Sequence, residues 1–138
     1  MIIADTGFFL ALANTRDRLH PQARRALARV TEPLVTTWPV MTETCHLMTA
    51  RMRAGAAEVF IGTAQRGAFQ IFALTSEHLP RVLELMRKYA DLPMDLADAS
   101  LVVLAEHLGS GRILSSDRRD FGAYRWKNHR PFQNLLAP

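Results

Sequence analysis

Four acidic residues occupy positions where a carboxylate needs a chemical reason to be. Asp5 directly follows the apolar run that opens the chain, and Asp117 follows another short apolar run. Glu43 and Asp98 interrupt stretches that otherwise have the apolar spacing of packed helices. Because burying a carboxylate without a partner is costly, the four acids are expected to share one function.

Carboxylates that converge on one place repel each other strongly. Two unit charges about 4 Å apart interact by about 4 kcal/mol at an effective dielectric constant near 20. A divalent cation removes this repulsion, and oxygen ligands favour a hard ion such as Mg²⁺ or Mn²⁺. A metal held in this way lowers the pKa of bound water and polarises a phosphoryl group. The acids therefore predict metal-dependent hydrolysis of a phosphodiester.

Short apolar runs alternate with helical patterns, which is typical of an α/β fold with a parallel sheet. Ligands of open α/β sheets bind beyond the carboxyl ends of the strands, where Asp5 and Asp117 fall. A simple helix N-cap remains an alternative for Asp5. Helices are predicted over residues 8–14, 20–30, 38–53, 56–66, 76–89 and 95–108, and strands over Met1–Ala4, Leu34–Thr37, Phe69–Leu74, Arg112–Ser115 and Phe132–Leu135.

The two helical acids are expected on faces that point inward. Glu43 shares one face of its helix with Val40, Leu47 and Ala50, so it should face the core. A solvated glutamate is the alternative there. Asp98 lies in a helix that is apolar on both sides, which indicates a buried helix. Free N–H groups in the first helical turn are the alternative explanation for this carboxylate.

Length and composition limit the class of protein. The chain of 138 residues fits one domain, 1–138, with ordinary values of 49% hydrophobic and 22% charged residues. No apolar run approaches the roughly 20 residues that span a bilayer, and the first residues do not resemble a secretory signal. The single cysteine, Cys45, excludes an internal disulfide framework and a cysteine-rich zinc site. We expect a cytoplasmic protein that does not enter a membrane.

The balance of charge mildly favours a polyanionic partner such as a nucleic acid. The formal net charge is +4, and setting aside the four clustered acids leaves nine acids against 17 Lys and Arg. An acidic pocket in a basic surface suits a metal-dependent nuclease. Arg24, Arg25 and Arg29 lie along the predicted helix 20–30. A solvated face is the simpler interpretation of these arginines, and an RNA contact is the alternative.

The motifs around the four acids resemble those of a known family. Asp5-Thr6-Gly7 follows an opening apolar strand, Glu43 lies in the third helix, and Asp98-Ala99 lies in a buried helix. Ser115-Ser116-Asp117 is followed shortly by Phe121. In this order and over essentially the whole chain, the motifs resemble PIN domains. More narrowly, the chain resembles the VapC-type ribonuclease toxins of bacterial and archaeal toxin–antitoxin pairs.

This resemblance implies a fold, an activity and partners. The fold would be a three-layer α/β/α sandwich around a mainly parallel sheet of four to five strands. The activity would be that of a Mg²⁺-dependent endoribonuclease, with Mn²⁺ as an alternative ion. The partners would be an RNA substrate, a cognate antitoxin and a second copy of the chain in a homodimer.

The resemblance implies a role for each of the four acids, from its position in the motifs. Asp5 and Asp98 would be the main metal ligands. Glu43 and Asp117 would complete the catalytic pocket, holding metal through water or a second ion and orienting the attacking hydroxide.

Four neighbours of these acids receive supporting roles. The hydroxyls of Thr6 and Ser115 would position an acid or a water molecule. Asp95 is interpreted as a helix cap near the metal site, and Asp120 could replace or assist Asp117.

Arg118 and Arg119, beside Asp117, are candidates for holding RNA phosphates, although two solvated arginines on an exposed turn would look the same.

Trp38 is expected in the core or in a dimer contact rather than as a platform for base stacking.

Two other functions compete with the ribonuclease. One is a catalytically silent PIN-like domain that binds nucleic acid or protein, which has no need for four acids. The other is a different metal phosphoesterase, such as a DNA-directed nuclease or a DxD phosphatase. The phosphatase fits poorly because the first strand ends in Asp-Thr-Gly, without a second aspartate.

Overall fold

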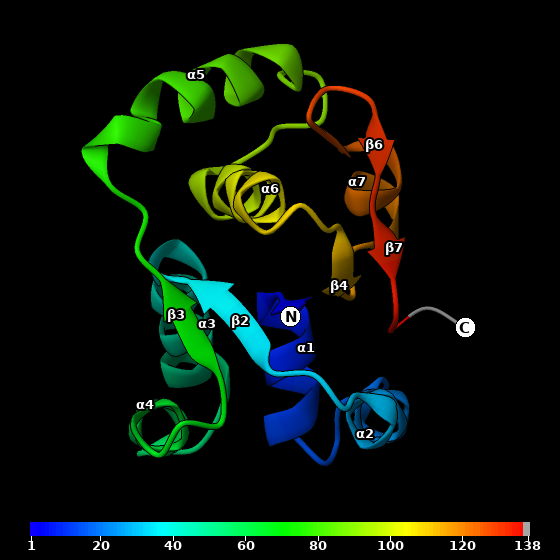
Figure 1. Cartoon of the computed structure of the whole chain (residues 1–138). Helices are drawn as coiled ribbons and strands as arrows, with labels where there is room; N and C mark the ends of the chain where they lie inside the picture. The colour runs from blue at the N-terminus through cyan, green and yellow to red at the C-terminus, as the bar shows by residue number, and fades with distance from the viewer. Residues whose placement is uncertain (137–138) are drawn as a thin grey trace.

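The computed structural model of the protein describes residues 1–136 and is built on a five-stranded sheet (Figure 1). Every pair of neighbouring strands is parallel, in the order β3-β2-β1-β4-β7. The central strands are buried on both faces, which explains their continuous apolar sequences. The strands are β1 Ile2–Ala4, β2 Leu34–Thr37, β3 Gln70–Phe72, β4 Arg112–Leu114 and β7 Gln133–Asn134.

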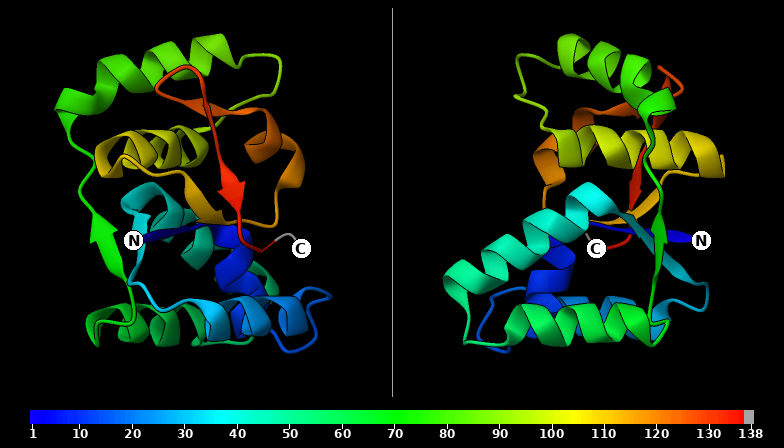
Figure 2. Two further views of the ribbon diagram at one scale, coloured as in Figure 1. Left: turned by 45° about the vertical axis from the view of Figure 1, so that its right-hand side comes forward. Right: turned by 90° about the vertical axis from the view of Figure 1, so that its left-hand side faces the viewer.

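Helices cover both faces of this sheet, so the predicted three-layer α/β/α sandwich is confirmed (Figures 1 and 2). One face carries α1 Thr6–Ala13, α2 His20–Arg29, α3 Trp38–Arg51 and α4 Ala56–Gln65. The other carries α6 Leu96–Leu108, and α5 Leu79–Lys88 lies outside α6. None of the helices in residues 1–136 has the length and hydropathy needed to cross a bilayer.

Helix α6 is the centre of the core, as its apolar sequence predicts. It lies between the sheet and α5, and its side chains from Leu101 to Leu104 are at most 5% exposed. Burying a leucine fully stabilises a fold by about 2 kcal/mol, so this helix holds its position firmly. Its first turn therefore provides a rigid support for Asp98.

The chain after β4 differs from the sequence prediction. Residues expected on a short turn form helix α7, Arg118–Ala123, because the Asp117 side chain caps it by accepting from the Asp120 N–H at 2.9 Å. An unpredicted hairpin follows, made of β5 Arg125–Trp126 and β6 Arg130–Pro131. Strand β3, at the edge of the sheet, is shorter than the predicted Phe69–Leu74. The predicted helix over 76–89 begins as a 3₁₀ turn, Ser76–His78, and continues as α5.

The predicted buried face of α3 is wrong by part of a turn. The buried side chains are Val40, Met41, Thr44 and Met48, whereas Ala50 of the predicted stripe is exposed. Helix α3 packs against α1, α4 and α6, and these contacts together select the buried face. Glu43 consequently lies half-buried at the border of that face, where it can reach both solvent and the other acids.

Candidate active site

The site lies at the carboxyl ends of two adjacent central strands. Strands β1 and β4 pair Ala4 with Leu114, so the next residues, Asp5 and Ser115, emerge side by side. The chain continues from β1 to β2 on one side, whereas β4 lies on the other. Such a change of direction opens a crevice at the sheet edge, which is where α/β folds bind ligands.

Asp5 is both a helix cap and a site carboxylate, so neither sequence interpretation excludes the other. One carboxylate oxygen accepts from the Thr6 N–H at 2.7 Å, and the second accepts from the Ser115 hydroxyl at 2.8 Å. The side chain is only 8% exposed. Burial, reinforced by Glu43 and Asp117, raises the pKa of Asp5 to about 6, although its hydrogen bonds lower it.

Gly7 allows α1 to approach the loop that carries Ser115 and Asp117. A Cβ atom at this position would lie 1.8 Å from the Ser116 Oγ and 2.8 Å from its Cβ. No side chain fits without displacing Ser116. The glycine of the Asp-Thr-Gly motif thus brings the two acidic loops together.

Asp98 lies in the first turn of α6 and is bonded from two directions. It forms a reciprocal capping box with Asp95: the Asp98 N–H donates to Asp95 at 2.8 Å, and the Asp95 N–H donates to Asp98 at 3.3 Å. Burial first, and then the charges of Asp95 and Asp5, raise the pKa of Asp98 to about 8. Asp95 is the helix cap that the sequence predicts.

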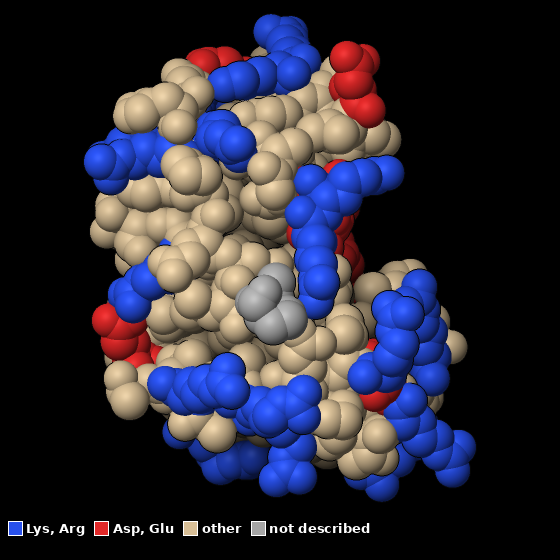
Figure 3. All heavy atoms as spheres, turned by 90° about the vertical axis from the view of Figure 1, so that its right-hand side faces the viewer, with Lys and Arg blue, Asp and Glu red and all other residues tan. Residues whose placement is uncertain are grey.

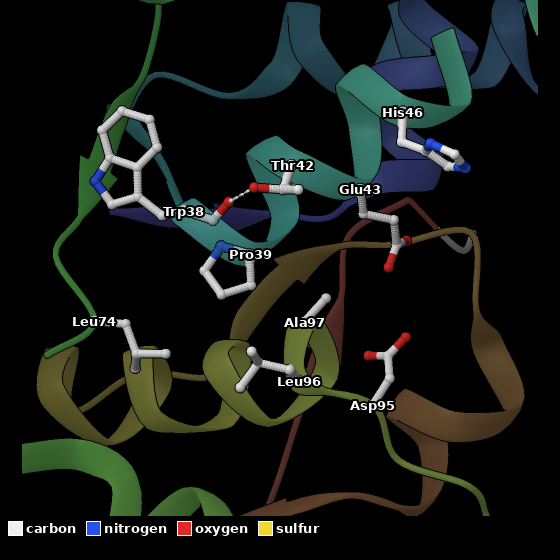
Figure 4. A pocket seen from close by; sticks show the side chains of 9 residues that line it. All are labelled: Trp38, Pro39, Thr42, Glu43, His46, Leu74, Asp95, Leu96 and Ala97. Carbon is white, nitrogen blue, oxygen red and sulfur yellow. Dashed lines mark hydrogen bonds between the residues drawn. The ribbon is translucent and has the colours of Figure 1, made fainter. Parts of the chain in front are cut away.

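Glu43 and Asp95 point toward each other from α3 and from the start of α6 (Figure 4). Burial and the Asp95 charge raise the pKa of Glu43, whereas the nearby Thr6 side chain lowers it. Thr6 is buried and its hydroxyl accepts from the Thr44 hydroxyl at 3.2 Å. Thr6, the first residue of α1, therefore links α1 to α3, the helix that carries Glu43.

A cavity of about 630 Å³ opens beside Glu43 and Asp95 (Figure 4). Its far wall is apolar and includes Trp38, Leu74 and Leu96. Trp38 is 54% exposed, so of its two expected positions the core is wrong, and the dimer contact stays a prediction. The first residue of α3 instead presents an aromatic surface next to the acids.

The loop after β4 joins Asp117 to the first acid. The Ser115 hydroxyl donates to Asp5 and accepts from the Asp117 N–H at 3.0 Å, so one side chain positions both. Burial, together with Asp120, raises the pKa of Asp117. Asp120 is itself 7% exposed and accepts from the Arg119 Nε at 3.1 Å. The sequence correctly places Asp120 beside Asp117.

Sequence reasoning missed Tyr124, which is fully buried and donates its hydroxyl to Asp98 at 3.3 Å. Burial and the neighbouring Asp98, Asp120 and Asp117 raise its pKa, so the hydroxyl keeps its proton and remains a donor. Its ring packs edge-on against Tyr89 and Phe121, at 5.0 and 5.1 Å between centroids. The only signal in the sequence is the spacing of three between Phe121 and Tyr124, which marks one helical face.

The pKa shifts indicate that the four predicted acids lie close enough to repel one another. Glu43 and Asp117 each raise the pKa of Asp5, and Asp5 raises that of Asp98. Within residues 1–136, however, no three His, Cys, Asp or Glu side chains lie close enough to hold one ion as they stand. The donor chemistry fits a hard divalent cation, because all four side chains are carboxylates. Asp5 and Asp98 are the most perturbed members of this set.

The chain matches the family model of the PIN domain over residues 2–127. It is 27% identical over 124 residues to ribonuclease VapC26 of Mycobacterium tuberculosis, covering 90% of this chain and 92% of that protein. Its fold resembles the crystal structure of VapC20 of Mycobacterium tuberculosis, a toxin that cleaves the sarcin-ricin loop. The TM-score is 0.80 at 21% identity, over 86% of this chain and 92% of the other.

A further structural relative is a toxin–antitoxin complex from Klebsiella pneumoniae, with a TM-score of 0.66 at 17% identity. That match covers 89% of this chain and 92% of the other. At these identities the two structures establish the likeness of the fold. The family model covers nearly the whole chain, from β1 through β5. The chain is a member of the PIN domain family.

Proposed function

We propose that this PIN domain is a metal-dependent endoribonuclease and the toxin of a toxin–antitoxin pair. The observation that carries the proposal is the set of four mutually perturbed carboxylates, Asp5, Glu43, Asp98 and Asp117, at the carboxyl edge of the sheet. A structural role alone would not explain so much uncompensated negative charge in one place. The names of VapC26 and VapC20 support ribonuclease chemistry and toxicity.

In this proposal Asp5 and Asp98 hold the metal, with Glu43 and Asp117 acting directly or through water. Mg²⁺, or Mn²⁺ in its place, would supply a nucleophilic hydroxide and polarise the phosphoryl group. The chain's own contribution is positional: Ser115 and the Thr6 N–H fix the Asp5 carboxylate, and Tyr124 fixes Asp98. These groups fix the orientation of the two carboxylates.

We further propose an antitoxin partner and a homodimer. The Klebsiella complex supports the antitoxin, because a relative of the same fold occurs with one. Support for the homodimer comes from large apolar side chains that stay exposed, including Trp38, Leu79 and Leu96 at 54%, 57% and 46%. Exposed apolar side chains of this size are frequent at contacts between proteins.

The test uses purified protein freed of any antitoxin and incubated with total cellular RNA. We expect discrete fragments with Mg²⁺ or Mn²⁺ and none with EDTA. Asp5→Asn and Asp98→Asn should each abolish the cleavage, because each removes a charged metal ligand while keeping its shape. Arg16→Gln, a surface change far from the acids, is the matched control. Cleavage by either aspartate variant at the wild-type rate would disprove the assignment of the site.

A further inference from the structure

Three arginines from two separate elements line one cavity close to the acids. Arg25 and Arg29 come from α2, and Arg118 is the first residue of α7. The cavity has a volume of about 270 Å³. All three side chains are exposed, and within residues 1–136 none of them forms an ion pair with a carboxylate. The cavity therefore carries concentrated positive charge that the described part of the chain does not neutralise.

A solvated helix face does not account for this arrangement. Helix α2 contains three arginines and no acid, and Arg25 and Arg29 are spaced i, i+4. Like charges at this spacing destabilise a helix by about 0.2–0.5 kcal/mol. Arg118 adds a third like charge to the same cavity from a distant part of the sequence. Convergence of this kind indicates an anion as the missing partner.

The cavity is linked to the acidic site by covalent and hydrogen bonds. Arg118 directly follows Asp117, whose N–H donates to Ser115, and Ser115 donates to Asp5. Figure 3 shows Lys and Arg side chains gathered on the lower part of this face, with more beside a hollow in which acidic atoms are visible. Arg118 thus joins the arginine cavity to the loop that carries Asp117.

We propose that Arg25, Arg29 and Arg118 form a phosphate pocket that holds the RNA backbone beside the bond to be cut. The inference rests on the proposed function, since it names how the substrate is held at that same site. Guanidinium groups bind phosphate oxygens in pairs, and neutralising phosphates releases counterions. Such contacts position the strand without reading its sequence.

A second group of arginines provides a matched control. Arg16, Arg51 and Arg53 line another cavity, at the far ends of α1 and α3. Helix α1 follows its N-cap, Asp5, and runs for eight residues, or about 12 Å, before reaching that end. Removing either group changes the net charge equally, but only the first group includes a residue, Arg118, that is adjacent to one of the acids.

The experiment measures binding of a labelled single-stranded oligouridylate to Asp98→Asn protein at several salt concentrations. Adding Arg25→Gln, Arg29→Gln and Arg118→Gln together should weaken binding about tenfold or more and reduce the salt slope by about 2. Changing Arg16, Arg51 and Arg53 to glutamine together should alter the binding and its salt slope little. Lysines at the three pocket positions should restore much of the binding and the salt slope, since lysine keeps the charge. In active protein, the pocket variant should raise KM more than it lowers kcat.

Each result decides the proposal. Equal losses in the pocket and control variants would overturn it, because they would reflect general charge alone. Unchanged binding in the pocket variant, with cleavage intact in the wild type, would disprove the pocket and leave the ribonuclease standing. No binding by the parent and no cleavage by the wild type would overturn both. Circular dichroism of each variant separates these outcomes from unfolding.

Discussion

At the residue scale, the most informative feature is how strongly each acid resists ionisation. The pKa of Asp98 is raised to about 8 from an ordinary 3.8, and that of Asp5 to about 6. The folded protein therefore binds these protons more tightly than the unfolded chain does. Without metal, these two residues make folding less favourable as pH rises from about 4 through about 8.

Asp98→Asn should consequently stabilise the metal-free protein at high pH. The amide oxygen still accepts from the Asp95 N–H, and the buried charge is gone. Thermal unfolding in EDTA should give similar midpoints for variant and wild type near pH 4, and a variant midpoint several degrees higher near pH 9. If the difference between the two unfolding midpoints stayed constant or shrank as pH rises, Asp98 would not carry the unfavourable buried charge that its raised pKa indicates. Mn²⁺ should stabilise the wild type and not the variant.

Tyr124→Phe tests the one site residue that sequence reasoning missed. The change removes the hydroxyl that donates to Asp98 and keeps the buried ring. Loss of such a supporting bond typically costs 10–100-fold in metal affinity or activity, so we expect about a tenfold loss of Mn²⁺ affinity and of cleavage rate. Tyr89→Phe is the control, because the Tyr89 hydroxyl contacts the Arg125 N–H and no acid. Equal effects of the two changes would indicate a structural role only.

At the element scale, the close approach of α1 to the loop after β4 sets the geometry of the acids. Gly7→Ala should raise the helix propensity of α1 by about 1 kcal/mol, yet the new Cβ would overlap Ser116. We expect the overlap to dominate, with a lower unfolding midpoint and reduced cleavage. Adding Ser116→Gly should recover both, because it removes the overlapping atoms. If Gly7→Ala alone were as stable and active as wild type, the loop after β4 would not be held against α1.

Sequence reasoning succeeded where one element determines the outcome. The apolar strands and the acids at their ends follow from local pattern, as does the burial of α6. It failed where several elements decide together: the buried face of α3 depends on α1, α4 and α6 at once, so Glu43 was displaced from its predicted stripe. Helix α7 was missed because its six residues make fewer than two turns, too few for an apolar repeat to show. Tyr124 was missed because its partner, Asp98, lies 26 residues away.

At the scale of the whole molecule, charge and apolar surface are separated. The arginine cavity lies beside Asp117, whereas Trp38 and Leu96 lie on the other side of the acids, next to Glu43 and Asp95. A strand of RNA held by the arginines would reach the acids from one side. The opposite side is then left for a contact with a second copy of the chain.

The proposed homodimer gives the last prediction. Light scattering after gel filtration should report twice the chain mass of 15.5 kDa. Trp38→Glu should lower the measured mass to that of the monomer, because an added charge opposes burial of the apolar surface around Leu96. Val59→Glu, an equally exposed apolar residue on α4, should leave the dimer intact. If the Val59 variant dissociates and the Trp38 variant does not, the contact lies on α4. A wild-type protein that is monomeric at high concentration would rule out the homodimer, and the exposed indole beside Glu43 would then be free to contact RNA bases.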